Sequence, residues 1–118
     1  TYVGAQLRLA QTVRDRQRRA EVARRREILH EVKALIQREE YRAAEAALAP
    51  LTDLAETDLL VAYRFAQAQL GAENTGEARR AWERVRRLDE DRLYRAQIAT
   101  AERRLEQMGG GASESVSI

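Results

Sequence analysis

The sequence Leu-Gly-Ala-Glu-Asn-Thr-Gly-Glu-Ala, residues 70 to 78, decides the fold of this chain, and Trp82 and Val85 follow it. It lies within a longer stretch from Leu59 to Asp89, which is predicted to form two helices closed on each other by a short turn. The rest of the chain is organised around this predicted hairpin, because its pattern repeats one found upstream.

The upstream pattern begins 34 residues earlier. Five positions align between the two copies: Ile36 with Leu70, Tyr41 with Thr75, Ala44 with Ala78, Leu48 with Trp82, and Leu51 with Val85. A period of 34 residues, with a small residue at the helix crossing and bulky residues four and seven positions later, resembles the tetratricopeptide repeat. The resemblance covers residues 25 to 108.

The resemblance implies an all-α fold, in which antiparallel helical hairpins stack as a short tetratricopeptide-like solenoid with a long N-terminal helix. In this family small residues lie where two helices touch, so Ala66 and Ala78 would be the close-contact pair. The earlier copy departs from the pattern at Glu31, where an apolar residue is expected, and at Val32, where a small one is. We expect three regions: a basic helical extension (residues 1–24), a tetratricopeptide-like domain (residues 25–108) and a flexible tail (residues 109–118).

The first half of the chain is expected to hold two helices and a linker. No glycine or proline occurs between residues 5 and 49, which predicts a long first helix over residues 5–39. The second helix is expected over residues 41–49, because Pro50 cannot continue it. Polar residues 52–57 are then a predicted linker.

The second half is expected to hold three more helices. Thr57 or Asp58 can cap the third helix, which is expected to end near Gly71, and Thr75 can cap the fourth, which ends at residues 88–89. Glu90 and Asp91 are expected to open the fifth helix, because acidic residues at a helix start complement its dipole. The three glycines at 109–111 are expected to end it and leave residues 112–118 mobile.

Positive charge is concentrated at one end of the chain. Residues 1–26 carry eight arginines against Asp15 and Glu21, a net charge of +6, whereas the remainder carries 13 basic and 17 acidic residues, a net charge of −4. A helix that is polar on every side, as residues 14–19 would be, projects into solvent or lies against a charged partner. The predicted basic surface consists of Arg14, Arg16, Arg18, Arg19, Arg24 and Arg25.

This basic segment leaves two alternatives open. It could meet phosphates as a nucleic-acid backbone binder, although no aromatic residue is interleaved with the arginines to stack on bases. It could instead belong to a membrane-proximal adaptor that follows an upstream membrane helix, since Tyr2, Val3 and Leu7 precede the basic run and the arginines could meet anionic headgroups. We rank the anionic membrane surface slightly above nucleic acid.

The residue combinations that catalysis needs are hard to find in the sequence: carboxylates are plentiful but lie at expected helix ends, and the serines of residues 113–117 have no nearby base. His30 is the only histidine and there is no cysteine, so a metal site with nitrogen or sulfur ligands is hard to assemble. The triple glycine lacks the preceding strand and the following lysine of a phosphate loop. We therefore predict that the chain is not an enzyme and has no cofactor and no metal site.

The tetratricopeptide resemblance favours protein–protein interaction. In that family the first helix of each pair lines a concave face that holds a peptide or a partner helix. The residues that match this face are Arg26, Leu29, Lys33, Ile36, Leu60, Tyr63, Gln67, Leu70, Tyr94 and Gln97. We expect a scaffold or adaptor subunit of a larger assembly. Self-association is a further alternative, since two and a fraction repeats leave apolar edges. A cytoplasmic or membrane-associated location is favoured.

Overall fold

The computed structural model describes the backbone of residues 2–117 and the side chains of residues 3–109. Within these residues the chain forms helices and no strand, which confirms the all-α class. The elements, in order, are α1 (Tyr2–Gln37), α2 (Tyr41–Leu48), the 3-10 helix η1 (Ala49–Glu56), α3 (Leu59–Gly71), α4 (Thr75–Leu88) and α5 (Arg95–Ser117).

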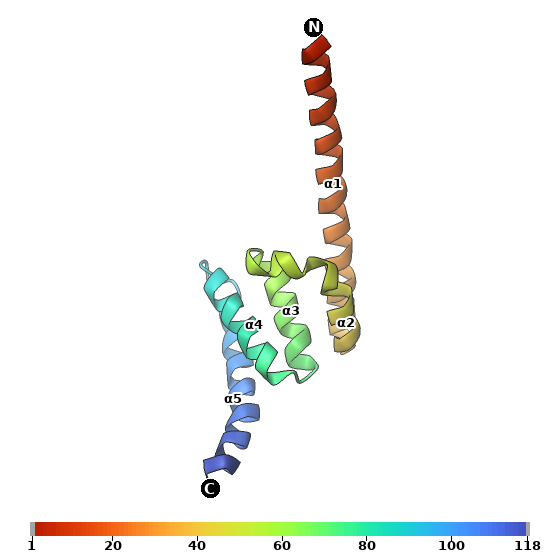
Figure 1. Cartoon of the computed structure of the whole chain (residues 1–118). Coiled ribbons are helices and arrows are strands. Elements are labelled where there is room, and N and C mark those ends of the chain that lie inside the picture. Colours follow the sequence, from red (N-terminus) through yellow and green to blue (C-terminus); the bar gives the residue numbers. More distant parts are fainter. Residues whose placement is uncertain (1, 118) are drawn as a thin grey trace.

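Helix α1 extends far beyond the other helices (Figure 1), and the molecule measures 79 × 28 × 23 Å along its principal axes. Residues 5–24 are all exposed, so the N-terminal part of α1 contributes nothing to a core. The C-terminal part packs against α2 and α3, and Val32 is fully buried there. Helix α1 is therefore one continuous helix with two parts, which are a projecting arm (residues 3–24) and a C-terminal segment that packs against the body.

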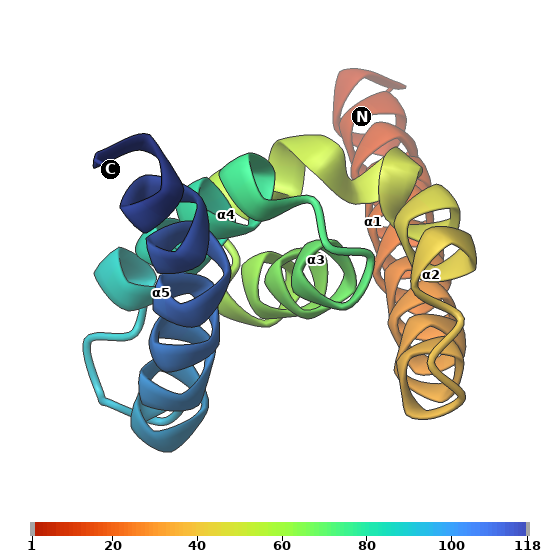
Figure 2. The same cartoon turned by 90° about the horizontal axis from the view of Figure 1, so that it is seen from below.

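Helix α3 is the centre of the body, lying between α5 on one side and α1 with α2 on the other (Figure 2). One of its faces contributes Ala62, Ala66 and Leu70 to a buried cluster shared with α4 and α5. Its other face contributes Val61 and Ala68 to a second cluster shared with α1, α2 and η1. Because both faces are buried, α3 reads as apolar nearly all round, as a central helix must.

The turns that close the two hairpins have the same geometry 34 residues apart. Glu39 and Glu73 adopt left-handed conformations, with φ of 61° and 63°. The N–H of the next residue donates back across each turn, from Glu40 to the carbonyl of Leu35 at 2.9 Å and from Asn74 to that of Gln69 at 3.0 Å. Each left-handed residue ends a helix and satisfies one of its last carbonyls.

Several aligned positions are also equivalent in burial. Ala44 and Ala78 are both fully buried, as are Leu48 and, nearly, Trp82. The predicted close-contact residue Ala66 is fully buried in the same cluster as Ala78. Glu31, the residue that departs from the apolar pattern, is exposed, so its charge stays in water.

The first half of the chain differs from expectation at both ends of α1, at the end of α2, which is Leu48 rather than residue 49, and in the linker. Helix α1 begins and ends a few residues earlier than residues 5–39. The expected linker over residues 52–57 is wrong, because residues 49–56 form η1 with Pro50 in its first turn. Proline fits there because the first N–H groups of a helix have no internal partner. Leu51 and Ala55 hold η1 in place, since both are buried in the second cluster.

The caps of the last two helices also differ. Asp58 caps α3 as expected, its Oδ1 accepting from the N–H of Val61 at 3.1 Å. The N-cap of α4 is Asn74 rather than Thr75. Helix α5 begins at Arg95 rather than at Glu90, because the buried carboxylate of Asp89 accepts from two backbone N–H groups and holds residues 89–94 in a turn.

The expected helix stop at residues 109–111 does not occur, since α5 continues to Ser117. The glycines therefore lie within the helix, where they are tolerated at a modest cost in helix propensity. The side chains of residues 110–118 lie outside the described residues, and the flexible tail over residues 109–118 stays a prediction.

Candidate protein-interaction groove

A groove with a volume of about 410 Å³ runs between α3 and α5 and reaches the end of α1; we call it the α3–α5 groove. Its floor and walls come from all five α-helices, because α3 lies between the neighbours that form the two sides (Figure 2). The lining residues are Ile36, Tyr41, Tyr63, Gln67, Leu70, Gly71, Trp82, Ala96, Gln97, Thr100, Ala101 and Arg104.

An aromatic cluster forms the base of this groove beside α5. The ring of Tyr63 stacks on that of Tyr94, with centroids 4.0 Å apart and planes 13° from parallel. The same ring meets Trp82 edge to face, with a centroid distance of 5.7 Å. Only 7% of Tyr63 is exposed, so the cluster is a rigid apolar wall rather than a mobile surface.

A short chain of hydrogen bonds connects the hydroxyl of Tyr63 to the side chains of Gln67 and Arg64. The Nε2 of Gln67 donates to the Tyr63 hydroxyl at 3.0 Å, and the Nη1 of Arg64 donates to Oε1 of Gln67 at 2.8 Å. Burial raises the pKa of Tyr63 above its ordinary value of 10.0, the positive charge of Arg64 opposes the rise, and Tyr94 adds to it. Tyr63 is therefore a neutral phenol that fixes the orientation of Gln67.

The end of the groove is closed by a tight contact between α2 and α3. The ring of Tyr41 lies directly over the Cα of Gly71, in the space that a Cβ would occupy. Gly71 has no left-handed backbone, so it is required here for close approach rather than for a turn. This contact between Tyr41 and Gly71 joins the first hairpin to the second at this end of the groove.

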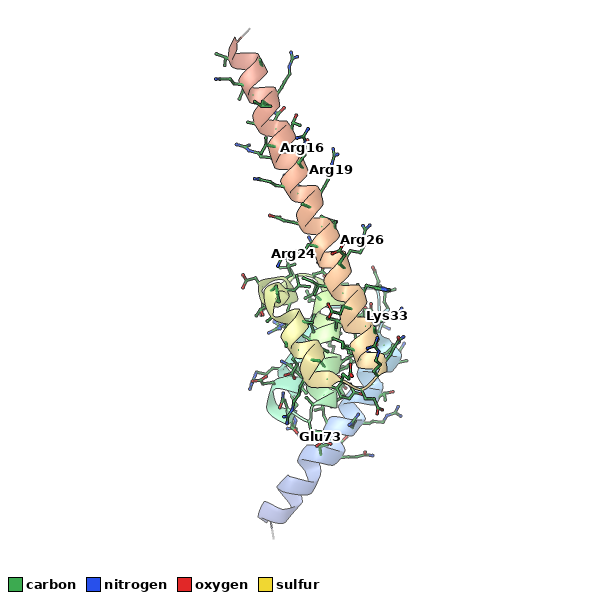
Figure 3. All side chains as sticks on the ribbon, turned by 90° about the vertical axis from the view of Figure 1, so that its right-hand side faces the viewer. Arg16, Arg19, Arg24, Arg26, Lys33 and Glu73 are labelled. Atoms are coloured by element: carbon green, nitrogen blue, oxygen red, sulfur yellow. The ribbon has the colours of Figure 1, made fainter. Side chains whose placement is uncertain are left out.

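The structure brings five residues of the expected binding face together in this groove: Ile36, Tyr63, Gln67, Leu70 and Gln97. Tyr94 supports them through its stack on Tyr63. The remaining four do not line it: Leu29 packs in the second cluster and Leu60 is exposed. Arg26 and Lys33 are exposed on α1 (Figure 3).

The sequence reasoning missed Tyr41, Gly71 and the α5 residues Thr100 and Arg104 as groove residues. A usable signal existed for α5, since Gln97, Thr100 and Arg104 follow one another at helical spacing on a single face. No such local signal existed for Tyr41 and Gly71, because they meet across 30 residues of chain.

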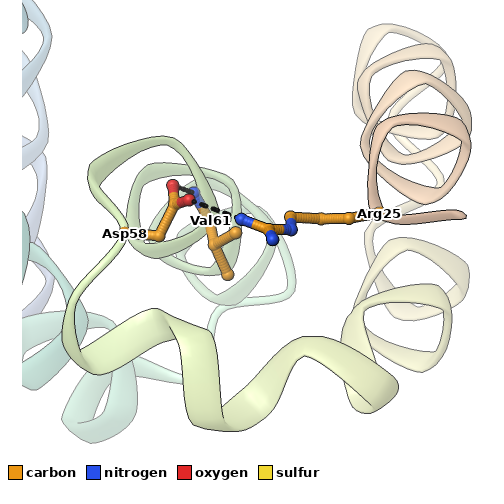
Figure 4. Close-up of polar contacts among 3 residues, drawn as sticks. All are labelled: Arg25, Asp58 and Val61. Carbon is orange, nitrogen blue, oxygen red and sulfur yellow. Dashed lines mark hydrogen bonds and ion pairs between the residues drawn. The ribbon is translucent and has the colours of Figure 1, made fainter. Parts of the chain in front are cut away.

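The expected basic surface is present on α1, with one exception. Arg14, Arg16, Arg18, Arg19 and Arg24 are exposed. Figure 3 shows Arg16 and Arg19 on the projecting arm and Arg24 close to the body. Arg25 is different, because its guanidinium pairs with Asp58 at 3.4 Å (Figure 4) and its side chain is only one third exposed. Arg25 therefore belongs to the joint between arm and body.

Metal-binding side chains do not gather into a site in the part of the chain that the structure describes. His30 is exposed, and no three His, Cys, Asp or Glu side chains lie close enough together there to hold a metal ion. None of the helices among residues 2–117 has an apolar stretch of the length and hydropathy that crossing a membrane requires.

No protein-family model matches this chain, and the comparisons with curated proteins and with solved structures gave no match.

Proposed function

We propose that this chain is a protein-interaction module, working as a scaffold or adaptor subunit of a larger assembly, that binds a segment of a partner protein in the α3–α5 groove. The observation that carries the proposal is the lining of this groove. The edges of the nearly buried Tyr63 and Trp82 rings lie beside the exposed amide of Gln97, a combination of apolar and hydrogen-bonding surface that suits a peptide.

The charge of the lining narrows the class of partner. Arg104 is the charged residue among the lining side chains, and no carboxylate lines the groove within the described residues. Ile36, Leu70 and the Trp82 ring provide apolar surface nearby. The fitting occupant is a peptide segment with an apolar side chain for the wall and an Asp or Glu for Arg104.

The repeated geometry supports a tetratricopeptide-like arrangement as the scaffold for this groove. Two helical hairpins are closed by equivalent turns at a spacing of 34 residues, and the first helix of each, α1 and α3, contributes to the lining of the groove. In such arrays the first helix of each hairpin lines the binding surface, and α5 occupies the position of the first helix of a third hairpin. Helices α3 and α5 would therefore contact the partner, and α4 would hold them in place.

Selection from a random peptide library displayed on phage, followed by fluorescence polarisation, tests this function. We expect the selected peptides to combine an apolar residue with Asp or Glu. A variant carrying Gln97→Ala and Arg104→Glu should bind them about tenfold or more weakly, because both side chains are exposed and their loss leaves the fold intact. Tyr63 is unsuitable for this purpose, since it is buried in the core.

The matched control carries Gln107→Ala and Arg80→Glu, which make the same chemical changes at exposed positions outside the groove. This control should bind the peptides as the unmodified chain does. Peptides that bind equally well to the groove variant would contradict the proposed function.

A further inference from the structure

We infer that the projecting arm of α1 is a docking element for an anionic lipid bilayer, with the first turns of the arm in the bilayer interface and its arginines at the phosphates. This inference goes beyond the α3–α5 groove and involves none of the residues that line it.

The first observation is exposed apolar surface at the far end of the arm. Leu7 and Leu9 are 61% and 66% exposed, and Val3 and Val13 are exposed beside them. At 3.6 residues per turn these four side chains fall within one half of the helix surface, which they share with Ala10, Gln6 and Arg14, whereas Arg8, Gln11 and Thr12 fall on the other half. An amphipathic end of this kind is suited to lie in a bilayer interface.

The second observation is the ring of positive charge next to that apolar end. Arg14, Arg16, Arg18 and Arg19 follow within two turns and point to different sides of the helix, with Asp15 as the single carboxylate among them. Figure 3 shows Arg16 and Arg19 reaching away from the helix, far from the body. Long basic side chains beside an apolar helix end reach the phosphate layer while the apolar face is buried.

The third observation is the opposite charge of the two parts of the molecule. Residues 1–26 carry a net charge of +6 and the rest carries −4. An anionic surface therefore attracts the arm and repels the body, which favours an orientation with the arm at the surface and the body in solution.

The other occupants fit this surface less well. Two copies of residues 1–24, with six arginines against Asp15 and Glu21, would bring +4 against +4, so self-association through the arm is opposed by repulsion. Nucleic acid would use the arginines but would leave Leu7 and Leu9 in water, and no described aromatic side chain lies on the arm to stack on bases. A bilayer uses both the apolar and the basic residues.

Vesicle flotation with the full chain tests the inference. Vesicles of phosphatidylcholine and phosphatidylserine should bind the chain, vesicles of phosphatidylcholine alone should bind it weakly, and salt should weaken the binding. Inorganic phosphate at millimolar concentration should not compete, because isolated anions offer no apolar interface.

Two arm variants separate the contributions. Leu7→Ser with Leu9→Ser should lower vesicle affinity about tenfold or more, and so should Arg14, Arg16, Arg18 and Arg19 changed to Gln. The matched controls are Leu60→Ser with Leu93→Ser, exposed leucines of the body, and Arg42, Arg80, Arg87 and Arg95 changed to Gln. Both controls should keep their vesicle binding.

Several results would overturn the inference. One is equal binding to both vesicle types, and another is loss of binding in the body controls. A third is tighter binding to a nucleic-acid duplex than to anionic vesicles, unchanged by the leucine substitutions, which would make the arm a nucleic-acid binder. The groove variant should bind vesicles normally, so failure of the groove function leaves this test intact.

Discussion

Arg25 of α1 and Asp58 at the start of α3 form an ion pair, with Nη1 of the arginine 3.4 Å from Oδ2 of the aspartate. The other carboxylate oxygen accepts the N–H of Val61, so one side chain both caps α3 and ties it to α1 (Figure 4). The pair lies where the arm meets the body.

Substitutions of Asp58 should separate its two roles. Asp58→Ala removes the cap and the ion pair and should lower the free energy of unfolding by about 1 to 2 kcal/mol. Asp58→Asn keeps an N-cap acceptor and should cost less than 1 kcal/mol, about the value of a partly exposed ion pair. Urea denaturation followed by circular dichroism measures both. Equal losses for the two variants would show that the charge, rather than the cap, dominates.

Gly71→Ala should destabilise the protein by about 1 to 3 kcal/mol, because its new methyl group overlaps the Tyr41 ring. In a Tyr41→Ala background the same change should cost little, which a double-mutant cycle measures. The control is Gly76→Ala in α4, where nothing lies within 4 Å of a new Cβ. That substitution should be neutral or stabilising by up to about 1 kcal/mol. A cycle without coupling would contradict the packing of Tyr41 on Gly71.

Trp82→Ala should lower the free energy of unfolding by about 3 to 5 kcal/mol, the cost of removing a large buried aromatic ring. Trp82→Phe should cost about 1 kcal/mol, because it keeps a ring in place and removes an Nε1–H that has no partner among the described residues. Thermal melts of the two variants are followed by circular dichroism, because both variants lack the only tryptophan and so cannot be followed by tryptophan fluorescence. A melting curve of Trp82→Ala that overlays the curve of the unmodified protein would show that Trp82 does not contribute to the core.

The stability of the protein should fall above pH 10 partly through Tyr63. Its pKa is raised by burial, so the folded state favours the neutral phenol while the unfolded chain ionises at the ordinary value of 10.0. Stability is therefore fully present below that value and is lost as pH rises toward the folded pKa. Denaturation curves at pH 9 to 11.5 should show a smaller decline for Tyr63→Phe than for the unmodified chain. Identical declines would mean that Tyr63 ionises freely in the fold.

Deleting residues 1–20 should leave the melting temperature unchanged, because the described side chains in that range are exposed apart from a half-buried Gly4. Helicity measured by circular dichroism should fall in proportion to the residues removed. A deletion to residue 27 is the contrasting case, since it also removes Arg25 and its ion pair with Asp58. A lowered melting temperature for the shorter deletion would show that the arm folds back on the body in solution.

Local signals predicted much of the helical framework. The local pattern offers Thr57 or Asp58 as the cap of the third helix and predicts its end near Gly71; Asp58 is the cap, and α3 ends at Gly71. The arrangement of five aligned positions predicted that Ala44, Ala78, Leu48 and Trp82 would be structural, and all four are buried. These features could be read because each depends on residues within a few turns of one another.

The starts and ends that were wrong depend on contacts that local rules do not contain. Residues 49–56 form η1 because Leu51 and Ala55 find a buried site against α1 and α3. Helix α5 begins late because Asp89, buried after α4, binds the N–H groups of Leu93 and Tyr94. In both cases burial against a distant element outweighs the local composition.

The sequence by itself determined the all-α class, the charge difference between the two ends, and the spacing of 34 residues that recurs in the two turns. Only the tertiary structure decided that Arg104 shares a groove with Ile36 and Gln97, that Tyr41 covers Gly71, and that Arg25 leaves the basic surface to pair with Asp58. The physical reason is that helix formation is a local property of the chain. Which side chains meet across helices depends instead on how both faces of α3 are packed.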